Sequence, residues 1–201
     1  MEYFVYCSNK PKVDALRAEH QEAHWAFMDQ YEDRMIARGP TLAEDGKTPN
    51  GSMHIVDLES EEEAKTFAHD EPYAKAGVFT DITIRRWTNA LKRTMWDFQG
   101  DVSSTRFLCI GYGPLGIDST ARRNELLQSH RDYLSAPGRV ERGILRGPLW
   151  DSAGEKWIGS IFLIEAPDPT FIKAFFVDEP YTKDGLYERF EMLLWRFGGR
   201  N

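Results

Sequence analysis

The feature that most constrains this chain is an internal repeat of about a hundred residues. The stretch Asp-Glu-Pro-Tyr-x-Lys-x-Gly occurs at residues 70–77 and again at 178–185. Segments 38–87 and 146–195 align without a gap, and each begins with Arg-Gly-Pro and ends with Trp. A fixed period of this length indicates two copies of one folding unit. Each position in one copy can therefore be compared with its counterpart in the other.

Composition and charge exclude several classes of protein. With 201 residues, 41% hydrophobic and 13% aromatic, the chain can bury one substantial core or two modest ones, as a soluble globular protein does. The net charge of -7 and the lack of a clustered basic patch argue against a nucleic-acid partner. No apolar run approaches the roughly 20 residues of a transmembrane helix, and the N-terminus lacks the basic start of a signal peptide. We therefore predict a cytoplasmic protein without a membrane partner.

Each copy is predicted to follow the order strand, helix, strand, strand, helix, strand. Aromatic and β-branched runs predict strands, apolar residues at helical spacing predict helices, and the two Gly-Pro pairs are expected to mark a turn. The expected strands are 3–8, 39–42, 53–58 and 78–87 in the first copy and 106–112, 161–165 and 186–195 in the second. The expected first helices are 13–36 and 121–134, and the second helices begin after Ser60, in a Ser-x-x-Glu capping pattern, and after Asp168.

This order is the ferredoxin-like βαββαβ arrangement of the α+β class, in which helices cover one face of a four-stranded antiparallel sheet. The other face must also be buried, and both copies are rich in aromatic residues. We therefore expect the two sheets to pack face to face as an α/β barrel formed within one chain. The predicted boundaries are 1–90 for the first domain, 91–104 for a linker and 105–201 for the second domain.

Cys7 and Cys109 each lie in the first apolar run of their copy. Cysteines in such positions are usually buried strand thiols, so we do not expect a disulfide or a nucleophile.

The first helices of the two copies share the pattern Arg-x-Glu-x4-His. It places Arg17 seven residues before His24 in one copy and Arg123 seven residues before His130 in the other. The two histidines are therefore equivalent positions of the repeat.

On these motifs the chain resembles two fused YCII-related (YciI-like) domains of the dimeric α/β-barrel superfamily. The resemblance rests on the helix histidines with their arginines, on the Gly-Pro and Gly-Ser pairs of each copy, and most specifically on the Asp-x-Pro-Tyr-x-Lys-x-Gly stretch. Members commonly read Asp-Pro-Tyr where this chain has Asp-Glu-Pro-Tyr. The resemblance implies a cleft with a His-Asp pair that does acid/base chemistry on small molecules. One similar member acts as a dehydrochlorinase on a chlorinated hydroxyquinol.

Elementary chemistry is consistent with such a pair. Histidine exchanges protons near neutral pH because its pKa is about 6.5, and an aspartate on its other nitrogen fixes the tautomer. The alternative is that the histidines are surface or capping residues and the aspartates cap a turn. The candidate catalytic residues are His24, Asp70, His130 and Asp178. The candidate substrate-binding residues, which could instead be solvated or satisfy backbone, are Arg17, Ser52, Arg123 and Ser160.

We do not expect a metal or an organic cofactor. His20 and His24 have the spacing of a metal-binding pair, but the counterpart of His20 is Leu126 and no third ligand lies nearby. His54 and His69 have apolar counterparts and are expected to be structural or exposed. No glycine-rich phosphate loop and no flavin or nicotinamide fingerprint is present.

The leading hypothesis is a cofactor-independent lyase or isomerase that acts on a small aromatic or acidic metabolite. Two alternatives stay open: a non-catalytic small-molecule binding protein, and a cofactor-free monooxygenase of the same barrel superfamily. Fold analogy does not choose among them. A homodimer of the two-repeat chain also stays open.

Overall fold

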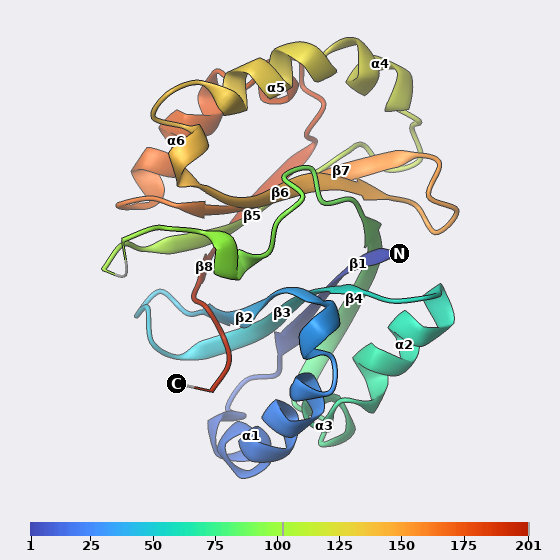
Figure 1. The fold of residues 1–201 in the computed structure, drawn as a ribbon, viewed down its shortest axis with the longest axis vertical. Helices are drawn as coiled ribbons and strands as arrows, with labels where there is room; N and C mark the ends of the chain where they lie inside the picture. Colours follow the sequence, from blue (N-terminus) through green and yellow to red (C-terminus); the bar gives the residue numbers. More distant parts are fainter. Residues whose placement is uncertain (102, 201) are drawn as a thin grey trace.

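The structure is a computed structural model and describes residues 1–101 and 103–200. Its two halves each consist of an antiparallel sheet with helices on the outer side, and the two sheets face each other (Figure 1). The first half contains β1 (Glu2–Asn9), α1 (Asp14–Asp29), η1 (Glu32–Arg34), β2 (Met35–Leu42), β3 (Pro49–Asp57), α2 (Glu61–Asp70), α3 (Pro72–Lys75) and β4 (Phe79–Trp87).

The second half repeats this order after a connecting segment that contains η2 (Met95–Asp97). Its elements are β5 (Arg106–Tyr112), α4 (Thr120–Glu125), α5 (Leu127–Ser135), η3 (Val140–Arg142), β6 (Gly143–Trp150), β7 (Trp157–Glu165), α6 (Pro169–Val177), α7 (Pro180–Lys183) and β8 (Arg189–Trp195). In the described part of the chain, no helix is long and apolar enough to cross a bilayer.

The strands form a closed barrel in the order β1-β3-β2-β8-β5-β7-β6-β4. Two junctions join the halves, and they are equivalent under the repeat: Thr41 pairs with Trp195 between β2 and β8, and Leu149 pairs with Trp87 between β6 and β4. Closure removes the unpaired sheet edges that two separate ferredoxin-like units would expose. The predicted fold, two ferredoxin-like repeats packed as an intramolecular α/β barrel, is confirmed.

The helix starts follow the capping residues read from the sequence. The Ser60 hydroxyl accepts a hydrogen bond from the Glu63 backbone N–H (3.1 Å), and the Asp168 carboxylate accepts one from the Phe171 N–H (2.8 Å). Each bond satisfies a donor that the first helical turn leaves unpaired. Pro169 occupies the first position of α6, where its missing N–H costs nothing.

The Gly-Pro pairs lie inside β2 and β6, so the expected turn is corrected, while the strand expected at 39–42 is part of β2. The glycines are needed there because another segment passes very close to them. A Cβ atom at Gly39 would lie 2.0 Å from the carbonyl oxygen of Arg196, and one at Gly147 would lie 1.8 Å from that of Thr88. Only glycine permits this approach.

The first helices also differ from prediction. Helix α1 ends at Asp29, and Met35 already pairs with Val56 in the sheet, so the apolar residues up to Ile36 belong to a buried strand. The second copy's helix is divided into α4 and α5 at Leu126, whose side chain packs against a buried aromatic cluster.

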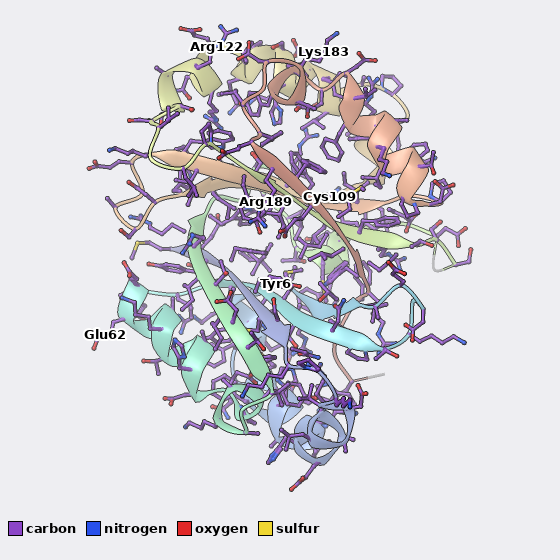
Figure 2. The ribbon with its side chains drawn as sticks, turned by 180° about the vertical axis from the view of Figure 1, so that it is seen from behind. Tyr6, Glu62, Cys109, Arg122, Lys183 and Arg189 are labelled. Carbon is purple, nitrogen blue, oxygen red and sulfur yellow. The ribbon has the colours of Figure 1, made fainter. Side chains whose placement is uncertain are left out.

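The main core lies between the two sheets, and a smaller core lies under the helices of each half. Figure 2 shows side chains filling the space between the sheets, while Glu62, Arg122 and Lys183 project from the outer helices. Cys7 and Cys109 are free and buried, as predicted. Burial raises the pKa of both thiols, so neither is an activated nucleophile.

Candidate active sites

The first cavity, of about 350 Å³, lies between α1 and the outer face of the first sheet. His24, on the inner side of α1, and Ser52, on β3, both line it. A corresponding cavity of about 500 Å³ in the second half is lined by His130 and Ser160. The repeat therefore produces two sites at matching places.

His24 is bonded to a buried carboxylate. Its Nδ1 lies 2.8 Å from Oε2 of Glu71, which is only 2% exposed. Glu71 caps the short helix α3, and its two oxygens also accept hydrogen bonds from the backbone N–H groups of Tyr73 (3.1 Å) and Ala74 (2.9 Å). Because a carboxylate engaged in this way is an acceptor, Nδ1 of His24 is the donor. The neutral ring then carries its lone pair on Nε2.

The second copy has the same arrangement. His130 Nδ1 lies 2.6 Å from Oε1 of the fully buried Glu179. The carboxylate accepts bonds from the backbone N–H groups of Tyr181 (3.1 Å) and Thr182 (3.0 Å). Two independent copies of the same hydrogen-bond network show that the arrangement follows from the repeated sequence.

The predicted pairing of the histidines with aspartates is corrected by this geometry. Asp70 is 52% exposed and forms an ion pair with Lys75 (3.1 Å), and Asp178 is 67% exposed and lies 3.4 Å from Lys183. The cause is the proline that follows the glutamate. Proline at the first helical position makes the preceding residue the N-cap, so the glutamate turns inward.

The sequence contained a signal for this glutamate. The same Glu-Pro pair stands in both copies, and a residue before a helix-starting proline is a capping position. The family resemblance, in which members commonly read Asp-Pro-Tyr, favoured the aspartate instead.

A tyrosine from the repeated stretch forms one wall of each site. The Tyr73 ring stacks on His24 with centroids 4.2 Å apart, and Tyr181 stacks on His130 at 4.0 Å. Stacking restricts rotation of the imidazole about χ2, which keeps Nδ1 on the carboxylate. The contact of these tyrosines with the histidines was not predicted from the sequence.

Arg17 lies beside Ser52 at the first site. One of its Nη atoms donates to Ser52 Oγ (3.3 Å) and to Asn9 Oδ1 (3.1 Å), and its guanidinium lies 4.4 Å from the centre of the Tyr73 ring. Burial lowers the pKa of Arg17. In the second copy Arg123 and Ser160 line the same cavity, and Arg123 bonds instead to Asn124 (2.9 Å). The structure thus brings these four predicted residues into the two cavities.

The segment after β8 crosses from the second half to close the first cavity (Figure 1). Arg196 N–H donates to the carbonyl of Pro40 (3.3 Å), and Gly198 N–H donates to that of Arg38 (2.9 Å). Arg196 and Gly198 both line the cavity.

The segment after β4 closes the second cavity in the same way. Thr88 N–H donates to the carbonyl of Pro148 (3.2 Å), and Ala90 N–H donates to that of Arg146 (3.0 Å). Each cavity is therefore completed by the other repeat, a contribution that no local sequence pattern indicated.

His54 is a further wall of the first cavity, although we expected it to be structural or exposed. It is 4% exposed, and its ring centroid lies 5.8 Å from that of His24. It stands two residues after Ser52 on β3, so both side chains point to the same face of the sheet. The spacing of two residues between Ser52 and His54 on a strand was the sequence signal that could have placed His54 at the site.

Burial holds the pKa of His54 well below its usual value, and the neighbouring charges of His24, Arg38 and Arg17 lower it further. The unfolded chain takes up a proton near pH 6.5 while the folded chain leaves His54 neutral. The free energy of unfolding should therefore fall as the pH drops below about 6.5, by up to about 1.4 kcal/mol per pH unit from this residue.

We expect His54→Phe, which installs the counterpart residue Phe162, to remove this component. Urea unfolding at pH 7.5 and 5.5 would show the variant losing about 1 kcal/mol less than the wild type over that range. Parallel pH dependence of the two proteins would contradict the assignment. His69→Phe, at an exposed position of α2, is the control.

A third cavity, of about 890 Å³, opens at one end of the barrel between the sheets. Tyr6 and Arg189 line it and lie between the two halves (Figure 2). Tyr112 donates to Glu191 (3.1 Å), which also pairs with Arg189. Its described lining includes no histidine, so the paired histidine and glutamate groups belong to the other two cavities. Across residues 1–101 and 103–200, no cluster of three or more His, Cys, Asp or Glu side chains is arranged to hold a metal ion.

Comparison with known families identifies the repeat. The YCII-related domain family matches residues 1–88 and again residues 106–196, which together make up most of the chain. The chain belongs to the YCII-related domain family. Protein YciI of Escherichia coli O6:H1 is 30% identical over 92 residues, covering 42% of this chain and 94% of that protein. One such domain thus corresponds to one repeat.

Two solved structures are similar to this chain. A 5-chloro-2-hydroxyhydroquinone dehydrochlorinase from Burkholderia phenoliruptrix AC1100 is 27% identical and covers 46% of this chain and 99% of its own, with a TM-score of 0.42. A mutant chlorite dismutase from Candidatus Nitrospira defluvii is 11% identical and covers 98% of this chain and 90% of its own, with a TM-score of 0.63. The second likeness shows that both halves of this YCII-related protein share the dimeric α/β-barrel arrangement.

Proposed function

We propose that this protein is a cofactor-independent lyase or isomerase that moves a proton on a small acidic or aromatic molecule. His24 in the first cavity and His130 in the second are the proposed general bases, and Glu71 and Glu179 orient them. The observation that carries the proposal is the buried glutamate on Nδ1 of each histidine, which leaves Nε2 as the basic nitrogen at the cavity.

The proposed step begins when Nε2 takes a proton from a carbon of the substrate. In one course, the electron pair of that C–H bond forms a double bond while a leaving group departs with its own electron pair. In the other course, the electrons shift along the substrate and the histidine returns the proton to a different carbon. The first course is an elimination and the second an isomerisation. The buried carboxylate stabilises the imidazolium formed in either course, because the positive charge arises within hydrogen-bonding distance of it.

The charges around both cavities support an anionic substrate. The protein carries a net charge of -7, yet Arg17, Arg38 and Arg196 line the first cavity, where Asp14 is the acidic residue in the described lining. A cationic hollow in an acidic protein concentrates small anions by focusing its field. Arg17 with Ser52, and Arg123 with Ser160, are the proposed contacts for the acid group.

The two alternative functions, a monooxygenase and a binding protein, predict different experimental results. One fold can host unrelated reactions in different proteins, so the fold does not select a reaction. A monooxygenase would consume oxygen during turnover, and a binding protein would hold the ligand without exchanging its protons. The cytoplasmic location and a homodimer of the two-repeat chain stay predictions.

The test is a screen for proton exchange in deuterium oxide. Small carboxylic acids and phenols with an acidic C–H bond are incubated with the protein, and deuterium uptake or loss of a leaving group is followed by mass spectrometry and NMR. We expect exchange or elimination with the wild type, no oxygen uptake, and loss of both reactions with the double variant His24→Gln, His130→Gln. Activity that is indifferent to the double change, or that requires oxygen, would overturn the proposal.

A further inference from the structure

The two cavities have diverged in the residues that form their walls. The second is larger, at about 500 Å³ against about 350 Å³. Its aromatic residues are Trp150, Phe162 and Tyr181, whereas those of the first are Trp25, Tyr73 and Phe197. Three residues of its wall have smaller or more polar counterparts in the first repeat, since Phe162 replaces His54, Trp150 replaces Leu42 and Leu127 replaces Gln21, while Arg131 replaces Trp25. With the tyrosine that both repeats carry, Trp150 and Phe162 give the second cavity a wall that suits a flat apolar group.

The second cavity also carries more uncompensated positive charge. The four charged residues of its described lining, all of them basic, are Lys92, Arg123, Arg131 and Arg146. In the first cavity, by contrast, Arg38 lies 3.5 Å from the carboxylate of Asp29.

Arg146, the counterpart of Arg38, has only neutral hydrogen-bond acceptors among the described residues. Its guanidinium donates to the carbonyl of Leu134 (2.9 Å) and to the hydroxyl of Ser135 (3.2 Å). Burial lowers the pKa of Arg146, and the nearby cations Arg93 and Arg131 lower it further. A half-buried arginine among like charges is a position that an anion would stabilise.

Arg123 has a donor without a partner among the described residues. Its Nε is buried without a hydrogen-bond partner among the described residues, and its guanidinium lies 5.6 Å from the centre of the Trp150 ring. A buried N–H without a partner is unfavourable in the folded protein. The cationic groups and the aromatic wall therefore meet at one place.

We propose that the second cavity binds an aromatic carboxylate, with the carboxylate on Arg146 and Arg123 and the ring against Trp150 and Phe162. A planar guanidinium matches a carboxylate through two parallel hydrogen bonds, and the cavity volume lies in the range typical of small-molecule sites. This inference rests on the proposed function in one respect, namely that both take the two cavities to be substrate sites. The first cavity, smaller and lined by His54, is expected to prefer a smaller and more polar acid.

Isothermal titration calorimetry of the full chain with benzoate and with acetate tests this. We expect benzoate to bind one site per chain at least about tenfold more tightly than acetate, since the ring buries apolar area that acetate lacks. Arg146→Gln should weaken benzoate binding about tenfold or more, while Arg38→Gln, the matching change in the first cavity, should alter it by less than about twofold.

Trp150→Leu keeps the arginines and installs the residue found at this position in the first repeat. It therefore tests the aromatic-carboxylate proposal even if Arg146→Gln does not fold. It should reduce benzoate affinity about fivefold and leave acetate affinity unchanged. Equal sensitivity to the Arg146 and Arg38 changes, equal binding of benzoate and acetate, or no benzoate binding at millimolar concentration would overturn the inference. Because the titration involves no turnover, its failure is separate from failure of the proton-exchange screen.

Discussion

Replacing His24 by Gln should lower kcat by about 10²- to 10⁴-fold for a substrate that reacts in the first cavity, because the amide cannot take up the proton. The change keeps a polar side chain of similar reach, so the bond to Glu71 can be retained by the amide N–H. Substrate affinity should change little, since the proposed anion contacts come from Arg17 and Ser52. Steady-state kinetics and direct binding measurements separate the two effects.

His20→Gln is the matched control for this prediction. His20 lies on the same helix, one turn earlier, but is partly exposed, with Glu19 as its charged neighbour at 4.0 Å. Its kcat should stay within about twofold of the wild type. His130→Gln addresses the second cavity, so the pair of single variants also tells which repeat turns over a given substrate. A kcat unchanged in His24→Gln and in His130→Gln would remove both histidines from the reaction.

The fold was largely predictable because duplication supplied a comparison within one sequence. The repeated strand and helix order, the capping residues Ser60 and Asp168, and the need to cover a second aromatic sheet face all led to the observed barrel. What local pattern could not provide was the close crossing at Gly39, where the segment after β8 passes. That contact joins distant parts of the chain, so the Gly-Pro pair resembled an ordinary turn.

The candidate site was predictable in its histidines and wrong in their partners. His24 and His130 stood out because both copies kept them, and both line cavities. Asp70 and Asp178 were kept as well, however, and repetition cannot separate a buried carboxylate from an exposed one next to it. The glutamate next to each aspartate points inward because the proline at the start of α3 or α7 makes the glutamate the N-cap residue.

Comparison of the copies misled in one further respect. It set His54 aside because its counterpart, Phe162, is apolar. The structure shows both residues on the walls of equivalent cavities. A position that differs between the two copies can therefore still line a site in each of them, because the two sites have diverged. Segments 88–92 and 196–199 each line the cavity of the other repeat. The two cavities can therefore acquire different walls within one barrel.

The sharpest test of the revised pair is Glu71→Gln compared with Asp70→Asn. The amide introduced by Glu71→Gln would offer its NH₂ to Nδ1 of His24. This favours the tautomer with hydrogen on Nε2 and leaves no lone pair at the cavity, so kcat should fall by about 10²-fold or more. Nitrogen NMR of the ring should show the tautomer change, a signature that general loss of structure would not produce. Stability should drop by about 1–3 kcal/mol, because the NH₂ group that faces His24 replaces the oxygen that now accepts from the Tyr73 backbone N–H.

Asp70→Asn removes only an exposed ion pair with Lys75. Its kcat and its His24 tautomer should therefore match those of the wild type, and its stability should agree within about 0.5 kcal/mol. The two carboxylates are neighbours in the chain, so any difference between the variants reports the direction in which each side chain points and not the loss of one negative charge from this part of the protein. A larger effect of Asp70→Asn than of Glu71→Gln would restore the aspartate as the partner of His24.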